Sequence, residues 1–159
     1  MSFNHTFKTQ VNWQLQNKET TINPKSFSRN HTVTIANKKA PLELSAAKPF
    51  RGDDTLYNPE DLLVSALASC HMMAYLFLCA QHGIAVLNYE DNAEATSNVE
   101  ATWRGQVTKV ILNPVVTIAD ASTKARAKTL HTEANSLCFI ANSCNFPVEH
   151  NVKIVIQAS

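Results

Sequence analysis

The chain has 159 residues, of which 45% are hydrophobic and 17% charged, and this composition predicts one globular domain over residues 1–159. The net charge is +1 and the lysines and arginines are scattered, which excludes the basic stripe of a nucleic-acid binder. Three scattered glycines cannot build a phosphate-binding loop, so nucleotide chemistry is excluded as well. The first ten residues contain no apolar signal segment, and we therefore expect a cytoplasmic protein with reduced thiols.

The first third of the sequence predicts a small β-sheet. Apolar and polar residues alternate at 11–16, 31–36 and 41–46, as they do in half-buried strands, and residues 37–39 between the last two predict a hairpin turn. Residues 46–57 predict a loop, because Pro49, Gly52 and two aspartates interrupt the pattern.

A long apolar helix is predicted from about 59 to 82. Asn58 is a capping residue, Pro59 suits the first helical position, and Gly83 suits the end. His71 and two serines interrupt its apolar sequence, so we interpret it as a buried central helix without membrane insertion. Because the helix is apolar nearly all round and the chain is short, we expect a partner chain to cover part of it.

The remaining sequence predicts β structure from Tyr89 to Ile118, a second helix from Ser122, and a final strand at 152–157. The second helix is predicted from apolar residues at helical spacing, namely Ala127, Leu130, Ala134, Leu137 and Cys138. The order of elements predicts an α+β fold with antiparallel β-sheets around two helices.

Four cysteines are the candidate chemical groups. Cys70 and Cys79 are separated by eight residues and Cys138 and Cys144 by five, and these spacings do not match a zinc site. Cys79 lies about 180° around the helix from Cys70, so we interpret it as a core residue. We interpret Cys144 as incidental.

Histidines offer a second possibility, a thiol hydrolase. His71 follows Cys70 directly and points about 100° away from it on a helix, so it cannot act as its base. His131 or His150 could approach Cys70 through the fold, but their sequence positions do not decide this.

Three segments together resemble the OsmC/Ohr family of thiol-dependent peroxide reductases, in its OsmC-like branch. They are the residues 58–63 (Asn-Pro-Glu-Asp-Leu-Leu), 68–72 (Ala-Ser-Cys-His-Met) and 138–143 (Cys-Phe-Ile-Ala-Asn-Ser). The ten-residue step from Glu60 to Cys70 matches the family's glutamate-to-cysteine step, and Arg29 fits the position of its arginine. The resemblance extends from about Arg29 to the last strand.

The resemblance implies an intertwined homodimer with active sites at the subunit interface. Cys70 would be the peroxidatic thiol and Cys138 the resolving thiol, while Arg29 and Glu60 would form an ion pair that activates Cys70. It implies no bound cofactor, an organic or lipid hydroperoxide as substrate, and an external thiol reductant such as dihydrolipoamide. Arg51 is the alternative to Arg29.

Glu60 presents a geometric problem, because ten residues of straight helix separate it from Cys70 by about 15 Å. Three solutions are open: the helix breaks, Arg29 bridges the gap, or Glu60 acts in the partner's site. The leading hypothesis is a cysteine-based organic hydroperoxide reductase. The alternative is a non-catalytic protein of the same fold that binds a hydrophobic small molecule.

Overall fold

The computed structural model describes residues 4–15 and 20–157, and the chain divides into two compact units, Met1–Leu62 and Leu63–Ser159. Each unit is described separately below. The order of elements in the sequence predicted an α+β fold, and the elements of both units confirm that class.

The N-terminal unit contains the predicted small sheet. Its strands are β1 (Gln10–Asn12), β2 (His31–Thr34) and β3 (Leu42–Leu44), and they pair antiparallel in the order β1-β2-β3. Asn37 takes a left-handed φ of 66° in the predicted hairpin turn, a conformation that asparagine tolerates well. A short 3-10 helix, η1 (Lys48–Phe50), lies in the predicted loop.

Ser45 connects the end of β3 to this loop. Its buried hydroxyl donates to Asn30 Oδ1 at 2.8 Å and accepts from the Asp53 backbone N–H at 3.0 Å. Gly52 is required nearby, because a Cβ there would lie 1.5 Å from the Ala46 carbonyl oxygen.

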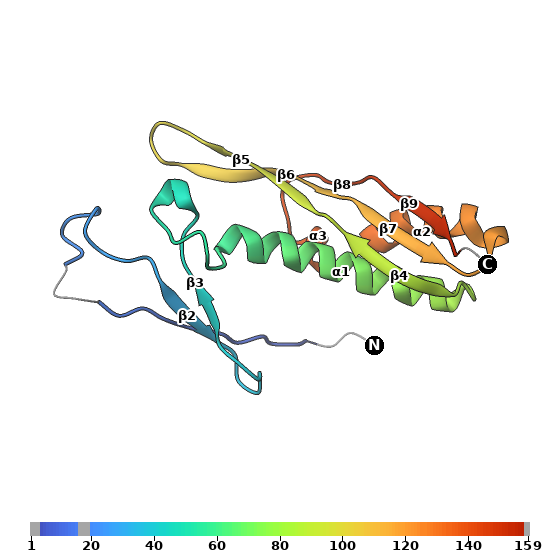
Figure 1. Ribbon diagram of the computed structural model, residues 1–159, viewed down its shortest axis with the longest axis horizontal. Coiled ribbons are helices and arrows are strands. Elements are labelled where there is room, and N and C mark those ends of the chain that lie inside the picture. Colours follow the sequence, from blue (N-terminus) through green and yellow to red (C-terminus); the bar gives the residue numbers. More distant parts are fainter. Residues whose placement is uncertain (1–3, 16–19, 158–159) are drawn as a thin grey trace. The chain divides into compact units, whose positions relative to one another are not determined.

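The C-terminal unit contains two three-stranded sheets (Figure 1). The first has the order β4-β7-β9, with β4 at Val86–Asp91, β7 at Pro114–Ile118 and β9 at Lys153–Ile156. The second has the order β5-β6-β8, with β5 at Glu94–Val99, β6 at Gly105–Leu112 and β8 at Val148–His150.

The prediction of purely antiparallel sheets is wrong in the C-terminal unit. β6 pairs with β8, and β7 with β9, in parallel. The reason is the connection: a helical segment lies between β7 and β8 in the chain, and a crossover of this length returns the chain in the same direction.

Helix α1 (Pro59–Gln81) forms as its end signals predict. The Asn58 side chain accepts from the Asp61 backbone N–H at 2.9 Å, and the Asp61 carboxylate accepts from the Asn58 N–H at 3.1 Å. This reciprocal pair is a capping box. Gly83 follows the helix with a φ of 66°, the left-handed conformation that ends helices.

The buried residues of α1 form one stripe along the helix. Its members are Leu67, His71, Tyr75, Leu78 and Cys79. The opposite side leaves Met73 61% and Phe77 57% exposed within this chain. The chain therefore covers one side of an apolar helix.

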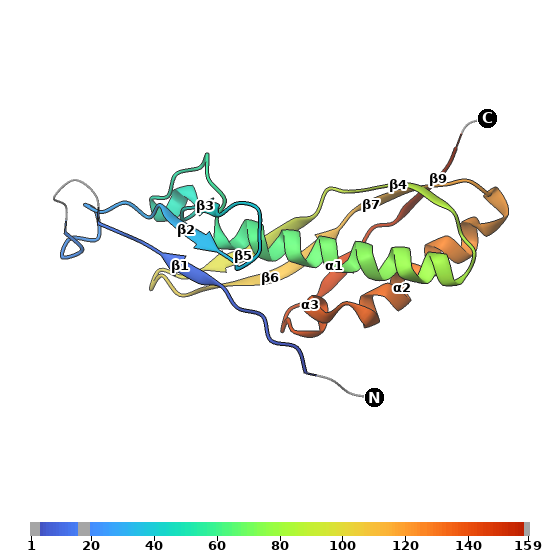
Figure 2. The same cartoon turned by 90° about the horizontal axis from the view of Figure 1, so that it is seen from below.

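Helix α2 (Lys124–Leu137) packs beside α1 on the same face of the β4-β7-β9 sheet (Figure 2). A short 3-10 helix, η2 (Ala121–Thr123), precedes it, and α3 (Phe139–Asn142) follows it. The core between these layers consists of Tyr75, Leu78, Cys79, Ile84, Val116, Ile118, Ala127, Leu130, Ala134 and Ile154. A second cluster, centred on Leu67, Val110 and Leu112, packs α1 and α3 against the β5-β6-β8 sheet.

Among the described residues, α1 is the one helix whose length and composition would suit a membrane span. The core helix of a water-soluble fold passes the same test, and α1 supplies side chains to both core clusters.

Truncating the core between α2 and the sheet should destabilise the protein strongly. Leu130 is fully buried, so we expect Leu130→Ala to lower the free energy of unfolding by about 2–5 kcal/mol, measured by urea titration. Leu137→Ala, at a 47% exposed position of the same helix, is the matched control and should cost less than about 1 kcal/mol. Equal losses in both variants would contradict the described core.

Candidate active site

The structure brings Cys70 and Cys138 together. Both lie in the C-terminal unit and are free thiols, and the two side chains are close enough to interact through a hydrogen bond. Cys70 lies at the edge of the buried stripe of α1 and is half-buried, whereas Cys138 is 1% exposed. The more accessible thiol is therefore Cys70.

Cys138 occupies a junction between two helices. The helical spacing placed it in the second helix, but α2 ends at Leu137, and Cys138 has extended backbone angles of φ −75° and ψ 106°. Its sulfur accepts from the Ala141 N–H at 3.4 Å and thus caps α3. The end of α2 fixes the position of this thiol beside α1.

The environment of Cys138 favours its protonated form. Burial raises the pKa of the Cys138 thiol to about 11, and the interaction with Cys70 contributes in the same direction. At neutral pH the proton therefore stays on Cys138, and this thiol is an available hydrogen-bond donor toward Cys70.

The other two cysteines have the surroundings of packing residues. Cys79 is 1% exposed in the core, and burial raises the pKa of its thiol. Cys144 is half-buried against the second core cluster, and burial raises its pKa too. Buried apolar surroundings make thiols unreactive, which agrees with the interpretation of Cys79 as a core residue.

Helix α1 is continuous from Pro59 to Gln81, so the first solution to the Glu60 problem, a helix break, is wrong. Glu60 is an exposed residue of the first turn and is separated from Cys70 by about 15 Å of helix. Direct contact between Glu60 and the Cys70 of the same helix is excluded.

Arg29 makes its described contacts inside the N-terminal unit. Its guanidinium donates to the Phe27 and Pro24 carbonyl oxygens and stacks on the Phe27 ring at 3.9 Å from the ring centroid. The ion pairs of the described residues are Lys48–Asp54, Lys109–Glu149 and Arg126–Glu133, so Arg29 and Glu60 are not paired here. The activating roles of Arg29, Arg51 and Glu60 stay predictions.

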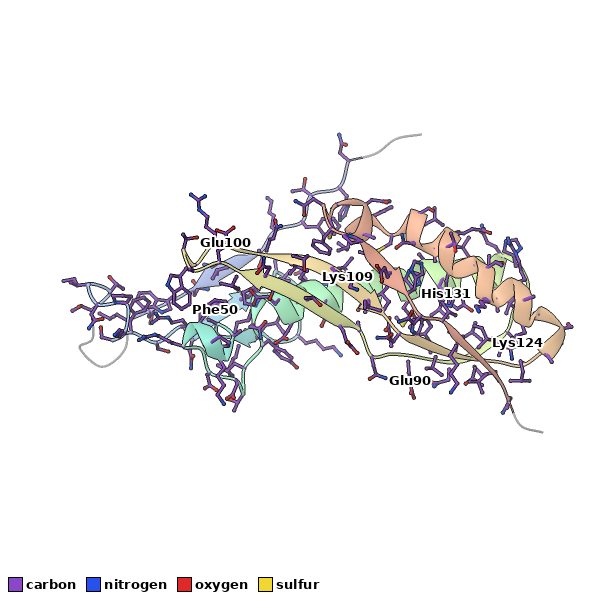
Figure 3. The ribbon with its side chains drawn as sticks, turned by 90° about the horizontal axis from the view of Figure 1, so that it is seen from above. Phe50, Glu90, Glu100, Lys109, Lys124 and His131 are labelled. Carbon is purple, nitrogen blue, oxygen red and sulfur yellow. The ribbon has the colours of Figure 1, made fainter. Side chains whose placement is uncertain are left out.

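Sequence reasoning missed a cluster of histidines around His71, the residue that follows Cys70 in the chain; His71 and His131 are buried and His150 is half-buried. His71 Nε2 and His131 Nδ1 form a hydrogen bond of 2.9 Å, and the His150 ring packs on His71 with 5.1 Å between centroids. Tyr75 stacks on His131 at 3.8 Å between centroids. His131 lies on the side of α2 that faces the strands (Figure 3). His131 and His150 thus approach His71, the residue next to Cys70 in the chain.

Burial keeps His71 and His131 uncharged at neutral pH. It lowers the pKa of His71 to about 4, and together with the neighbouring histidines it lowers the pKa of His131 to about 3. Burial also raises the pKa values of Tyr75 and Tyr89. The only sequence signal of the cluster is a histidine inside an apolar helix.

The described residues contain no group of three or more metal-ligating side chains arranged to hold an ion. His71 packs on His131 and on His150, and His131 packs on Tyr75. The fold and the cysteine pair define the class instead: an α+β protein with two neighbouring free thiols of unequal exposure.

The chain belongs to the OsmC-like protein family, whose family model matches residues 52–153. Comparison with curated proteins gives no match. Among solved structures, an OsmC-like protein of unknown function from Vibrio cholerae is 29% identical, with a TM-score of 0.82 over 94% of this chain and 99% of that one.

Two further structures share the fold at lower identity. An organic hydroperoxide resistance protein from Elizabethkingia anophelis, with thiocyanate bound, is 16% identical, with a TM-score of 0.68 over 99% of this chain and 100% of that chain. A putative organic hydroperoxide resistance protein from Vibrio cholerae, with captopril bound in one of its active sites, is 20% identical. Its TM-score is 0.63 over 97% of this chain and 95% of that chain.

The histidine cluster should make the protein acid-labile. Both histidines have folded-state pKa values below the ordinary 6.5, so the unfolded state binds more protons as the pH falls below 6.5. The free energy of unfolding should therefore fall between pH 6.5 and about 4, by at most about 1.4 kcal/mol per pH unit for each histidine. Urea titrations at several pH values measure this slope.

Two variants assign the slope to the cluster. His131→Phe keeps an aromatic ring at the stacked position and removes one titrating group, so it should reduce the slope by about half. His5→Gln changes an exposed histidine and should leave the slope unchanged. A wild-type stability that does not vary over this pH range would contradict a buried neutral cluster.

Proposed function

We propose that the protein is a cysteine-based peroxidase that reduces organic hydroperoxides to alcohols. The observation that supports this proposal is the neighbouring pair of free thiols, in which Cys70 is half-buried and Cys138 fully buried. Membership of the OsmC-like family and fold similarity to two organic hydroperoxide resistance proteins agree with it.

The first half-reaction takes place at Cys70. Its thiolate attacks the distal oxygen of the hydroperoxide, an S–O bond forms, and the O–O bond breaks. The leaving alkoxide takes a proton and departs as the alcohol, and Cys70 becomes a sulfenic acid. The Cys138 thiol, which retains its proton at neutral pH, donates a hydrogen bond to the Cys70 sulfur before the attack.

The second half-reaction forms a disulfide. The Cys138 sulfur attacks the Cys70 sulfenic sulfur, an S–S bond forms, and the hydroxyl group leaves with the Cys138 proton as water. An external dithiol, such as dihydrolipoamide, then reduces the disulfide by thiol exchange and is itself oxidised. No bound cofactor takes part in this cycle.

An organic substrate is favoured by the apolar surroundings of Cys70. Leu63, Leu67 and Ala68 of α1 and Ile140 of α3 belong to one apolar cluster, and they are near Cys70 and Cys138 in the chain. Each methylene of a substrate that is buried there adds about 0.8 kcal/mol to binding. Hydrogen peroxide has no such group. Organic or lipid hydroperoxides are therefore the proposed substrates.

The proposed active form is a cytoplasmic homodimer. Within one chain, α1 leaves apolar side chains such as Met73 and Phe77 exposed, and an apolar helix surface of this kind is normally covered. A second copy would cover that surface and would allow Glu60 to act in the partner's site. Because α1 is continuous, this solution and bridging by Arg29 are the two that stay open.

Peroxide turnover should depend on two cysteines only. With cumene hydroperoxide and a dithiol reductant, Cys70→Ser should abolish turnover, because serine forms no sulfenic acid. Cys138→Ser should allow one oxidation of Cys70 and then stop dithiol-dependent turnover. The measurement is peroxide consumption over time.

Cys144→Ser is the matched control, since Cys144 is half-buried and lies six positions from Cys138, and it should retain wild-type turnover. Turnover that survives Cys70→Ser would contradict the proposal. Acylation of Cys70 by an activated ester, with peroxide left unconsumed, would indicate a thiol hydrolase.

Arg29 should act as a positioning residue for the Cys70 thiolate. Arg29→Gln should slow the oxidation of Cys70 about tenfold or more, measured by stopped-flow with cumene hydroperoxide, because a guanidinium near the sulfur stabilises a thiolate. Arg51→Gln is the control. A larger effect of Arg51→Gln would transfer the role to Arg51.

A further inference from the structure

Cys138 has two structural roles in the reduced protein. Its side chain is the N-cap of α3, because the sulfur accepts a hydrogen bond from the Ala141 N–H at 3.4 Å. The same side chain is close enough to Cys70 to interact with it through a hydrogen bond. One sulfur therefore belongs both to the thiol pair and to the start of a helix, and a change in its bonding must affect the helix.

Helix α3 depends on this cap. It is a single turn of four residues, and none of the four is buried. A turn this short is unstable by itself, because several residues are ordered for few hydrogen bonds. Beyond the cap, the Asn142 N–H donates to the Cys138 carbonyl oxygen at 3.0 Å, and the Asn142 side chain donates to the Ser136 carbonyl oxygen at 2.9 Å. With so few contacts, loss of the cap should unwind α3.

The Cys70 side of the pair is held rigidly. Cys70 lies on the 23-residue helix α1 between two buried residues, Leu67 and His71. Leu67 belongs to the second core cluster, and His71 is hydrogen-bonded to His131 of α2 at 2.9 Å. A covalent bond between the sulfurs requires them to come closer than a hydrogen bond holds them. The movement therefore falls on Cys138 and α3, since α1 cannot move without disrupting the core.

The burial of Cys138 gives this movement a consequence for thiol exchange. Cys138 is 1% exposed, so an external dithiol cannot reach its sulfur in the reduced arrangement. Thiol exchange requires access to the sulfur that is attacked. Phe139, the first residue of α3, is 80% exposed, so the segment that would unwind lies at the surface. Its unwinding would bring solvent and reductant to the buried side of the pair.

We propose that α3 is a redox-sensitive switch: the Cys70–Cys138 disulfide removes the cap at Ala141, and residues 139–144 unwind beside the disulfide. The inference rests on the proposed disulfide cycle, in which two thiol protons and two electrons pass to the hydroperoxide and yield an alcohol and water. A dithiol then attacks the accessible disulfide, and its second thiol resolves the mixed disulfide. Both cysteines return as thiols, the dithiol becomes a disulfide, and Cys138 caps α3 again.

Hydrogen exchange followed by mass spectrometry tests the switch. The disulfide is formed in one sample with cumene hydroperoxide and in a second with diamide, an oxidant that requires no peroxidase activity, and peptide mapping verifies the linkage. The amides of Ala141, Asn142 and Ser143 should exchange about fivefold faster in the linked protein than in the reduced protein, the size expected when a helix loses its cap. The amides of α1 are the internal control and should not change.

Two variants of Cys138 test the cap without any oxidation. A serine side chain caps helices well, whereas alanine has no capping group. In reducing buffer, Cys138→Ala should speed exchange at the three α3 amides about fivefold, and Cys138→Ser should keep it near the wild-type rate. Equal exchange in the two variants would overturn the capping role of Cys138.

The two oxidants separate the switch from the peroxidase proposal. Linkage and faster α3 exchange with diamide, but no linkage with peroxide, would contradict the peroxidase and support the switch. Linked protein whose α3 amides exchange as slowly as those of the reduced protein would overturn the switch. Failure of both oxidants to link Cys70 to Cys138 would overturn both proposals.

Discussion

The burial of one stripe of α1 is the constraint on which the rest of the C-terminal unit depends. Leu67, Tyr75 and Leu78 enter two core clusters, and they fix the helix against both sheets and against α2. Cys70 lies at the edge of this stripe, so the same packing leaves it half-buried. The end of α2 then sets Cys138 beside it. The packing of the core therefore determines the positions and the unequal burial of the two thiols.

The core also contains polar groups that a simple apolar packing would avoid. The pair His71–His131 satisfies one nitrogen of each ring at 2.9 Å, and buried Nδ1 of His71 and Nε2 of His131 are without a protein partner among the described residues. Burying such groups costs free energy, so the cluster lowers stability relative to an apolar core. The acid lability has a related origin, because burial penalises the charged form of both rings more than the neutral form.

The sequence predicted the helix ends and strands that depend on residues close together in the chain. Asn58, Pro59 and Gly83 marked the ends of α1 because caps act within one turn, and alternation located β2 and β3. The parallel partners β8 and β9 were not predicted as such, because parallel pairing depends on distant strands and β8 has three residues. The family motifs indicated Cys70 and Cys138, whereas the meeting of His71, His131 and His150 depends on tertiary packing alone.

The central claim is that Cys70 and Cys138 act as one redox pair. Its most direct test is peptide mapping by mass spectrometry after the reduced protein has reacted with one equivalent of cumene hydroperoxide. The account predicts a single disulfide that joins Cys70 to Cys138, with Cys79 and Cys144 still free thiols. Four free thiols beside unconsumed peroxide, or a disulfide that leaves out Cys70, would contradict it.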